Sequence, residues 1–240
     1  MAETSGAEAR IAEYFTEVVD LVRPWASSVG RLFDDGRPPS AQAVDSAVAA
    51  LVTPTLRSTR RQVVGAGFIA APDSLSGTTW HMAWWQGPEP QRLATVSPAE
   101  AGEIYARREW FTVPMETGEP HITGPYVDFL CTDDYTVTIT VPVPAATPAG
   151  VVGADLLVAA LEEPLERELA AVAPTASLVN RAGRVLVSAD PEVAAGTVLV
   201  GPWRHGGPEV GRGGGAAADT VQSGCRLLPL PALPLAVMVP

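Results

Sequence analysis

The sequence has only two cysteines and no long apolar run, and these absences set the first limits on its function. Cys131 and Cys225 lie far apart and do not form the dense pattern of a secreted disulfide scaffold. No stretch approaches the roughly 18 consecutive apolar residues of a membrane-spanning helix. The N-terminus is acidic and lacks the basic and apolar regions of a signal peptide. We therefore expect a cytoplasmic protein with no membrane contact.

Basic residues are also scarce, because 16 Lys and Arg stand against 27 Asp and Glu, for a net charge of −11. This balance argues against nucleic acid or an anionic membrane surface as a partner, since both would repel the protein. Apolar residues make up 47% of the 240 positions, which is enough for a sizeable hydrophobic core.

Signatures of catalysis are weak. His81, His121 and His205 have no metal-ligand spacing, and no serine lies in a Gly-x-Ser-x-Gly elbow. One loose cluster could be drawn as the site of a metal-dependent enzyme: His121, Asp128, Cys131, Asp133 and Asp134. Its spacing is unspecific, so we expect no enzymatic activity, no metal and no cofactor.

The N-terminal part of the chain has helical periodicity. Apolar residues recur every three or four positions over 7–33, which predicts a long amphipathic helix. Pro24 should kink this helix or split it near Asp20. Ser40 can cap a second helix over 41–52. Three aliphatic residues of that helix should face the core: Val44, Val48 and Leu51.

Strand patterns dominate the middle of the chain. We expect strands at 63–70, 78–86, 91–96, 123–130, 134–143 and 149–158. Gly65 and Gly67 indicate a bulge or a close approach of backbone within the first strand. The adjacent Trp84 and Trp85 must point to opposite faces of theirs. Alternating threonines over 134–143 predict a sheet with one hydrophobic face and one hydroxyl-bearing face.

Two further helices and a second β unit complete the prediction. The Ser-Pro-Ala-Glu signature at 97–100 predicts a helix over 98–107 that delivers Arg108 and Trp110 on a loop. Another helix over 162–172 precedes four short strands at 177–180, 184–187, 223–228 and 234–239. The pattern predicts an α/β (α+β) protein in three parts: a helical segment 7–60, a main module 61–165 and a smaller module 166–240.

Several polar anchors fall within the main module. Asp155 lies inside an apolar strand, where a carboxylate is costly to bury unless a cation meets it. An arginine fork suits a ligand carboxylate, whereas aspartates and a tyrosine hydroxyl suit an ammonium group. Five residues could together bind a zwitterion such as an α-amino acid: Arg108, Trp110, Tyr126, Asp128 and Asp155. From residue types alone, an internal salt bridge from Arg108 to one of the two aspartates is equally open.

These anchors belong to four short motifs in a fixed order. They are Arg-x-Trp-Phe at 108–111, Pro-Tyr-x-Asp at 125–128, a Thr-rich strand ending in Pro-Val at 142–143, and Val-Gly-x-Asp at 152–155. The ordered set resembles the ligand-binding module of double Cache sensor domains, which are PAS-like extracytoplasmic domains of bacterial chemoreceptors and histidine kinases. The resemblance covers 7–165 well and is weaker over 166–240. It implies Cache-like antiparallel sheets with a long N-terminal helix, in two modules.

The resemblance also implies roles for individual residues. Carried over by motif from the amino-acid-binding members, the ligand site comprises Arg108, Trp110, Phe111, Tyr126, Asp128 and Asp155. The arginine and tryptophan would bind the ligand carboxylate, and the tyrosine and the two aspartates would bind its amine. Phe111 occupies a position that is often tyrosine and lacks the hydroxyl. Glu103 stands about where a further tyrosine is expected, so the resemblance implies different contacts to the amine here.

We therefore expect a non-catalytic sensor for signal transduction that binds an amino acid or a related amine. A homodimer through 7–33 is also expected, because the apolar face of that helix exceeds what a solitary covering helix needs. Two alternatives remain open. One is a regulatory or interaction subunit in which an internal Arg–Asp bridge closes the pocket, and the other is a metal-dependent enzyme that uses the 121–134 cluster.

Overall fold

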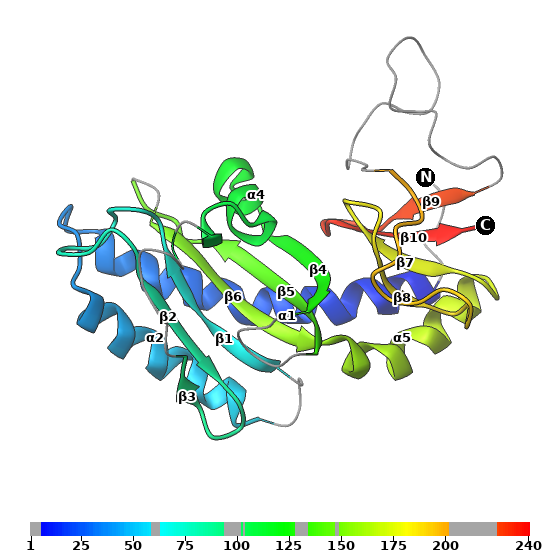
Figure 1. The fold of residues 1–240 in the computed structure, drawn as a ribbon, viewed down its shortest axis with the longest axis horizontal. Helices are drawn as coiled ribbons and strands as arrows, with labels where there is room; N and C mark the ends of the chain where they lie inside the picture. The colour runs from blue at the N-terminus through cyan, green and yellow to red at the C-terminus, as the bar shows by residue number, and fades with distance from the viewer. Residues whose placement is uncertain are drawn as a thin grey trace, which may run out of the picture.

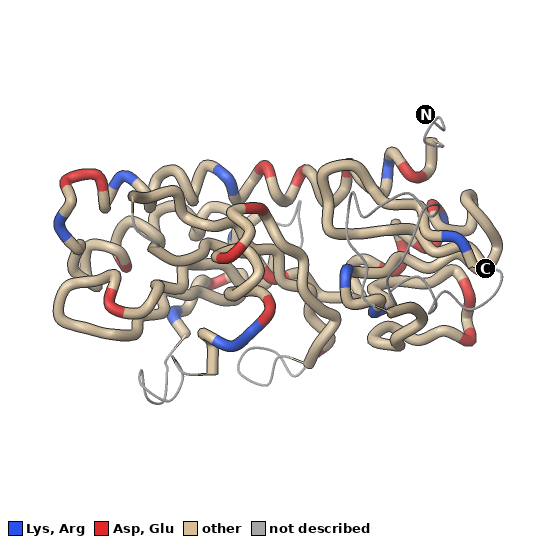
Figure 2. The backbone as a smooth tube through the Cα atoms, turned by 90° about the horizontal axis from the view of Figure 1, so that it is seen from above, with Lys and Arg blue, Asp and Glu red and all other residues tan. Residues whose placement is uncertain are grey.

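The computed structural model describes residues 6–58, 63–93, 102, 104–127, 134–146, 149–201 and 225–240. Two antiparallel sheets lie one beyond the other along the molecule, and the long helix α1 (Gly6–Gly30) runs along both of them (Figure 1). The predicted α+β class with a long N-terminal helix is confirmed. Acidic and basic positions are spread along the length of the chain (Figure 2). Within the described residues, no helix combines the length and apolarity that crossing a bilayer requires.

The larger sheet has six strands in the order β3-β2-β1-β6-β5-β4, and every neighbouring pair is antiparallel. Its strands are β1 (Val63–Ala70), β2 (Met82–Gln86), β3 (Gln91–Arg92), β4 (His121–Val127), β5 (Tyr135–Pro142) and β6 (Gly150–Leu157). The two predicted hairpins, β2–β3 and β5–β6, are present. Gly87 turns the first hairpin with a φ of 77°, which glycine adopts without steric cost.

Helices α1 and α2 (Ala41–Leu56) cover one face of this sheet, and the short 3-10 helix η1 (Arg31–Phe33) follows α1. Pro24 lies inside α1, and the helix is not split there. Ser40 caps α2 as predicted, because its Oγ accepts a hydrogen bond from the N–H of Ala43 at 3.2 Å. Leu51 packs against the core as predicted but is only partly buried. The helix continues to Leu56, so its inward stripe advances in steps of four residues to Val52.

Side chains of β5 alternate between the two faces of the sheet. Val137, Ile139 and Val141 join the core beneath the helices. Thr136 and Thr138 are also buried but lie on the opposite face, which we call the free face of the large sheet. The predicted division into a hydrophobic and a hydroxyl-bearing face is therefore confirmed.

Helix α4 (Glu109–Thr117) contacts β4, β5 and β6 and covers part of the free face. The sequence prediction placed Arg108 to Trp110 on a loop, and this was wrong, because α4 begins at Glu109. Pro114 inside the helix has no N–H to donate to the carbonyl of Trp110 one turn earlier. The hydroxyl of Thr140 donates to that carbonyl instead, at 2.8 Å, so a contact from another strand stabilises a helix that its own sequence disfavours. Half of the predicted helix 98–107, residues 98–101 and 103, lies outside the described residues.

The smaller sheet has the order β8-β7-β10-β9 and follows α5 (Val158–Val172). Its strands are β7 (Ser177–Asn180), β8 (Val185–Ser188), β9 (Arg226–Pro229) and β10 (Leu235–Val239). Helices α1 and α5 are joined by an ion pair of 2.7 Å from Arg10 to Glu168, and this hydrogen-bonded contact lowers the pKa of the Glu168 carboxyl. The side-chain amide of Asn180 donates to the carbonyl of Gly124 at 2.6 Å and links the two sheets. The division into modules 61–165 and 166–240 stays a prediction.

Candidate functional site

Asp155 lies on the free face of the large sheet and is 4% exposed. Antiparallel register places it between Gly65 of β1 on one side and Thr138 of β5 on the other. Directly opposed residues in an antiparallel pair share a face of the sheet. The glycine therefore lets the carboxylate approach the backbone of β1 closely, and the threonine offers the carboxylate a hydroxyl.

A relay of hydroxyl groups meets the carboxylate from β5 and β4. The hydroxyl of Thr138 donates to Asp155 Oδ1 at 2.6 Å, and Tyr126 Oη lies 2.5 Å from the same threonine oxygen. A hydroxyl has one proton, and that of Thr138 is already shared with Asp155. Tyr126 is therefore the donor to Thr138. This relay fixes the carboxylate orientation and brings two of the predicted site residues together.

Trp84 lies flat over three glycines on the same face. A Cβ atom at Gly65 would lie 2.9 Å from the indole Nε1, one at Gly67 would lie 2.8 Å from Cε3, and one at Gly153 would lie 3.4 Å from Cη2. These glycines thus provide the floor on which the ring rests. The predicted close approach at Gly65 and Gly67 is confirmed, and the pairing of β1 with β6 shifts register between Val63 and Gly65.

The aromatic wall of the site comes from α4. Trp110 and Phe111 are 9% and 6% exposed and pack with Trp84 in one hydrophobic cluster on the free face. Tyr105 lies against Trp110, with ring centroids 5.7 Å apart. Tyr126 is also packed against this cluster. Three of the predicted site residues therefore line one aromatic region on the free face.

Arg108 is the N-cap residue of α4, with an extended backbone and an exposed side chain. It forms no ion pair with any acidic residue that the structure describes, Asp155 included. The predicted partner residue Asp128 lies outside the described residues. The structure therefore shows a buried carboxylate on the free face. At the N-terminal end of α4 it shows an arginine that pairs with none of the described acidic residues.

His121 is buried under the first turn of α4, and its Nε2 lies 2.9 Å from Glu109 Oε1. Of the cluster drawn as a metal site, only His121 and Asp134 fall within the described residues. In that part of the chain, no three His, Cys, Asp or Glu side chains gather as metal ligands. His81 likewise pairs with a carboxylate, at 2.8 Å from Asp45 Oδ1.

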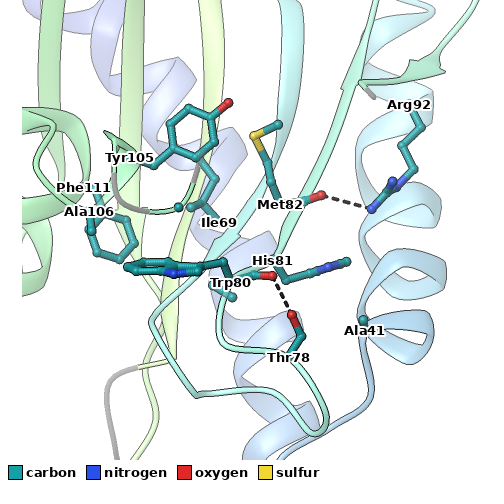
Figure 3. A pocket seen from close by; sticks show the side chains of 12 residues that line it. Ala41, Ile69, Thr78, Trp80, His81, Met82, Arg92, Tyr105, Ala106 and Phe111 are labelled. Carbon is teal, nitrogen blue, oxygen red and sulfur yellow. Dashed lines mark hydrogen bonds between the residues drawn. The ribbon is translucent and has the colours of Figure 1, made fainter. Parts of the chain in front are cut away.

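A cavity of about 230 Å³ opens at the other end of the free face (Figure 3). Trp80, Tyr105 and Phe111 line it on one side, and His81 and Arg92 line it beside α2. Its β1 residues lie about 13 Å along the strand from the position opposite Asp155, at about 3.3 Å per residue. The cavity and the carboxylate are therefore separate features, with α4 beside both.

Sequence reasoning missed three contributors to this face. Thr138 was recognised only as part of a hydroxyl-bearing strand, and its partner could not be known before the register of β5 against β6 was fixed. Trp84 was assigned a face in general terms but no contact. Gly65 gave the clearest signal, because a glycine inside a strand often marks a close approach.

Solved structures of sensor domains share this fold. The ligand-binding domain of the Pseudomonas fluorescens chemoreceptor CtaA in complex with L-isoleucine is 18% identical, with a TM-score of 0.58 over 97% of this chain and 86% of that chain. The Pseudomonas aeruginosa amino acid chemoreceptor PctC in complex with GABA is also 18% identical, with a TM-score of 0.53 over 97% and 95%. A methyl-accepting chemotaxis protein X gives 20% identity and a TM-score of 0.57 over 98% and 96%.

Extracellular domains of histidine kinases also match, with TM-scores near those of the chemoreceptors. One of them, from the kinase soHK1S-Z6, is 12% identical with a TM-score of 0.54 over 78% of this chain and 68% of that chain. No protein-family model matches the sequence, and no curated protein matches it. The fold is therefore that of chemoreceptor and sensor-kinase ligand-binding domains, and the predicted Cache-like fold is confirmed.

Proposed function

We propose that this protein is a non-catalytic sensor domain that binds an amino acid or a related amine on the free face of the large sheet. The observation that carries the proposal is Asp155, a carboxylate that is 4% exposed and oriented by the Tyr126–Thr138 relay. A buried and oriented carboxylate offers an ammonium group a charge-assisted hydrogen bond.

The covering helix supplies the second half of the proposed site. Trp110 and Phe111 bound the face with aromatic surface, and Arg108 precedes them with an exposed guanidinium. In the proposal, Arg108 and Trp110 bind the ligand carboxylate, and Tyr126 and Asp155 bind its amine. Asp128, which follows β4, joins the amine contacts as the sequence motif implies.

Known ligands of the similar structures support this ligand class. The CtaA domain was solved with L-isoleucine, L-valine and L-serine, and the PctC domain with GABA. Each of these molecules carries an amine and a carboxylate. A site with an oriented carboxylate and a nearby arginine fits the same pair of charges.

Thermal-shift screening against the twenty proteinogenic L-amino acids tests the proposal directly. A ligand present at about 100 times its dissociation constant stabilises the protein by roughly 2.7 kcal/mol, which is easily measured.

Calorimetric titration of Asp155→Asn should then show lost affinity, because a neutral amide does not balance an ammonium charge. Asp20→Asn on the exposed side of α1 makes the same charge change and should leave affinity unchanged. Equal affinity in the Asp155 variant would place this residue outside the site.

We also propose that the protein is cytoplasmic and forms a weak homodimer through 7–33. The apolar stripe of α1 is buried within the chain, so a dimer would use its partly exposed residues, such as Tyr14 and Leu21. Light scattering at high micromolar concentration should show a species larger than the 25.0 kDa monomer. A monomer alone would contradict the dimer, and recovery of the tagged full chain in a membrane or external fraction would contradict the location.

A further inference from the structure

Trp84 has a buried indole N–H that the proposed function has not used. The residue is 5% exposed, and its Nε1 finds no hydrogen-bond acceptor among the described residues. Buried donors in folded proteins are nearly always paired, and an exception calls for a ligand, a water or a functional reason. An indole nitrogen is a donor only, so whatever pairs with it must supply an acceptor atom.

The orphan donor and the buried carboxylate meet over one glycine. The point at which a Cβ of Gly65 would lie is 2.7 Å from Asp155 Oδ2 and 2.9 Å from Trp84 Nε1. Glycine has no side chain, so both polar atoms can pack against its backbone. Measured through this point, the donor and the carboxylate oxygen lie within about 5.6 Å of each other, so one ligand that carries both a nitrogen and an oxygen can reach both.

An ammonium group alone does not satisfy both of these partners. It carries three donors and no acceptor, so it can pair with Asp155 but leaves the N–H of Trp84 unpaired. To pair with the indole, the same ligand must also carry an oxygen close to its nitrogen. In α-amino acids and 2-amino alcohols, an oxygen is bonded to the carbon next to the one that carries the amine. Simple alkylamines have no such oxygen.

We propose that Trp84 is a specificity-determining residue whose indole N–H donates to a ligand oxygen adjacent to the ammonium group. The site therefore selects α-amino acids and 2-amino alcohols over the corresponding amines. This inference rests on the proposed binding of an amine by Asp155. It adds a contact from β2, a strand that carries none of the predicted site residues.

The geometry around the ring makes Trp84 a fixed donor. Its Cε3 and Cη2 atoms lie over Gly67 and Gly153, at 2.8 and 3.4 Å from the Cβ positions that those glycines lack. The ring also packs with Trp110 and Phe111 from α4. A donor held between a sheet and a helix loses little freedom on binding, so its hydrogen bond adds affinity efficiently.

The test compares Trp84→Phe with Trp85→Phe. Phenylalanine keeps an aromatic ring on the glycine floor but removes the N–H. Trp85 is the adjacent residue, points to the opposite face beneath the helices, and lies under the guanidinium of Arg92 at 6.0 Å. Its replacement makes the same chemical change outside the site, so it controls for the loss of an indole from the large sheet.

Calorimetry uses three probes: the amino acid that stabilises the wild type most, its 2-amino alcohol, and the amine that lacks the oxygen. The wild type should bind the first two more tightly than the third. Trp84→Phe should weaken the amino acid and the amino alcohol about tenfold, equivalent to about 1.4 kcal/mol, and leave the amine unchanged. Trp85→Phe should change none of the three. Equal wild-type affinity for the amino alcohol and the amine would overturn the inference.

An independent readout is the indole ¹H–¹⁵N resonance of Trp84, assigned as the peak that Trp84→Phe removes. It should move on addition of the amino acid, and the Trp85 peak should not. Gly65→Ala provides a second variant, because its Cβ would lie 2.7 Å from Asp155 Oδ2 and 2.9 Å from Trp84 Nε1, displace both groups and abolish binding of all three probes. Binding of the amino acid with an unmoved Trp84 peak overturns this inference alone, whereas no binding of any amino acid overturns the proposed function as well.

Discussion

The two sheets differ in how their second faces are filled. On the small sheet, the face turned away from the main core is aliphatic and packs Val179, Val185 and Met238 against Val200. On the large sheet, the corresponding face carries threonines, glycines and Asp155 beneath an aromatic helix. Side chains of the same chain thus pack the second face of the small sheet. The large sheet keeps polar groups and space, which is what a small-molecule site requires.

Most unpaired polar atoms follow the same division. Four buried side-chain atoms find no hydrogen-bond partner among the described residues, and three of them lie on strands of the large sheet: Trp84 Nε1, His121 Nδ1 and Thr123 Oγ1. The fourth, Arg181 Nε, lies in the turn between β7 and β8. A folded protein tolerates few such groups, because each has a desolvation cost that nothing offsets. Their concentration on one face indicates where an outside molecule can add hydrogen bonds.

Leu178→Ala removes a side chain from the face of the small sheet that joins the main core, and it should have the largest effect. Leu178 is fully buried, and removing such a side chain typically costs about 2–5 kcal/mol of stability. If 61–165 and 166–240 are separate modules, calorimetry should resolve two transitions, and only one should move. Amino-acid affinity of the folded protein should stay the same. A single transition that shifts as a whole would contradict the division into modules.

Two threonines on the free face of β5 provide a matched pair with a smaller effect. Thr140→Val removes the donor to the Trp110 carbonyl and should cost about 1–3 kcal/mol of stability, because that carbonyl is left unpaired. Thr138→Val removes the donor to Asp155 and should lower amino-acid affinity about tenfold. Denaturant melts and calorimetry measure the two outcomes. Equal effects of both variants on binding would mean that the relay has no particular role.

Arg108→Ala should have the smallest effect on stability. Its side chain is exposed and pairs with no described acidic residue, so the ligand-free protein should lose less than about 0.5 kcal/mol. Affinity for an amino acid should fall, and Arg108→Lys should not restore it, since an ammonium does not reproduce the planar fork. Affinity for an amine without a carboxylate should be unchanged. A large stability loss without ligand would support the alternative of an internal Arg–Asp bridge.

Much of the fold could be predicted because its signals are local. Residues close together in the sequence determine the helical spacing of α1, the Ser40 cap of α2 and the alternation along β5. Helix α4 could not be predicted in this way, because Pro114 opposes it. Its compensating hydrogen bond comes from Thr140, which lies on another strand.

The candidate site divides along the same line. The sequence by itself determined the residue types, since an aspartate inside an apolar strand and glycines within β1 already indicate charge and close approach. Only the tertiary structure decided that Asp155 stands between Gly65 and Thr138, because register depends on the pairing of three strands. It also decided that Trp84 reaches the same point. Asp155 and Trp84 lie on strands far apart in the sequence, and they come within reach of one ligand only when the sheet has formed.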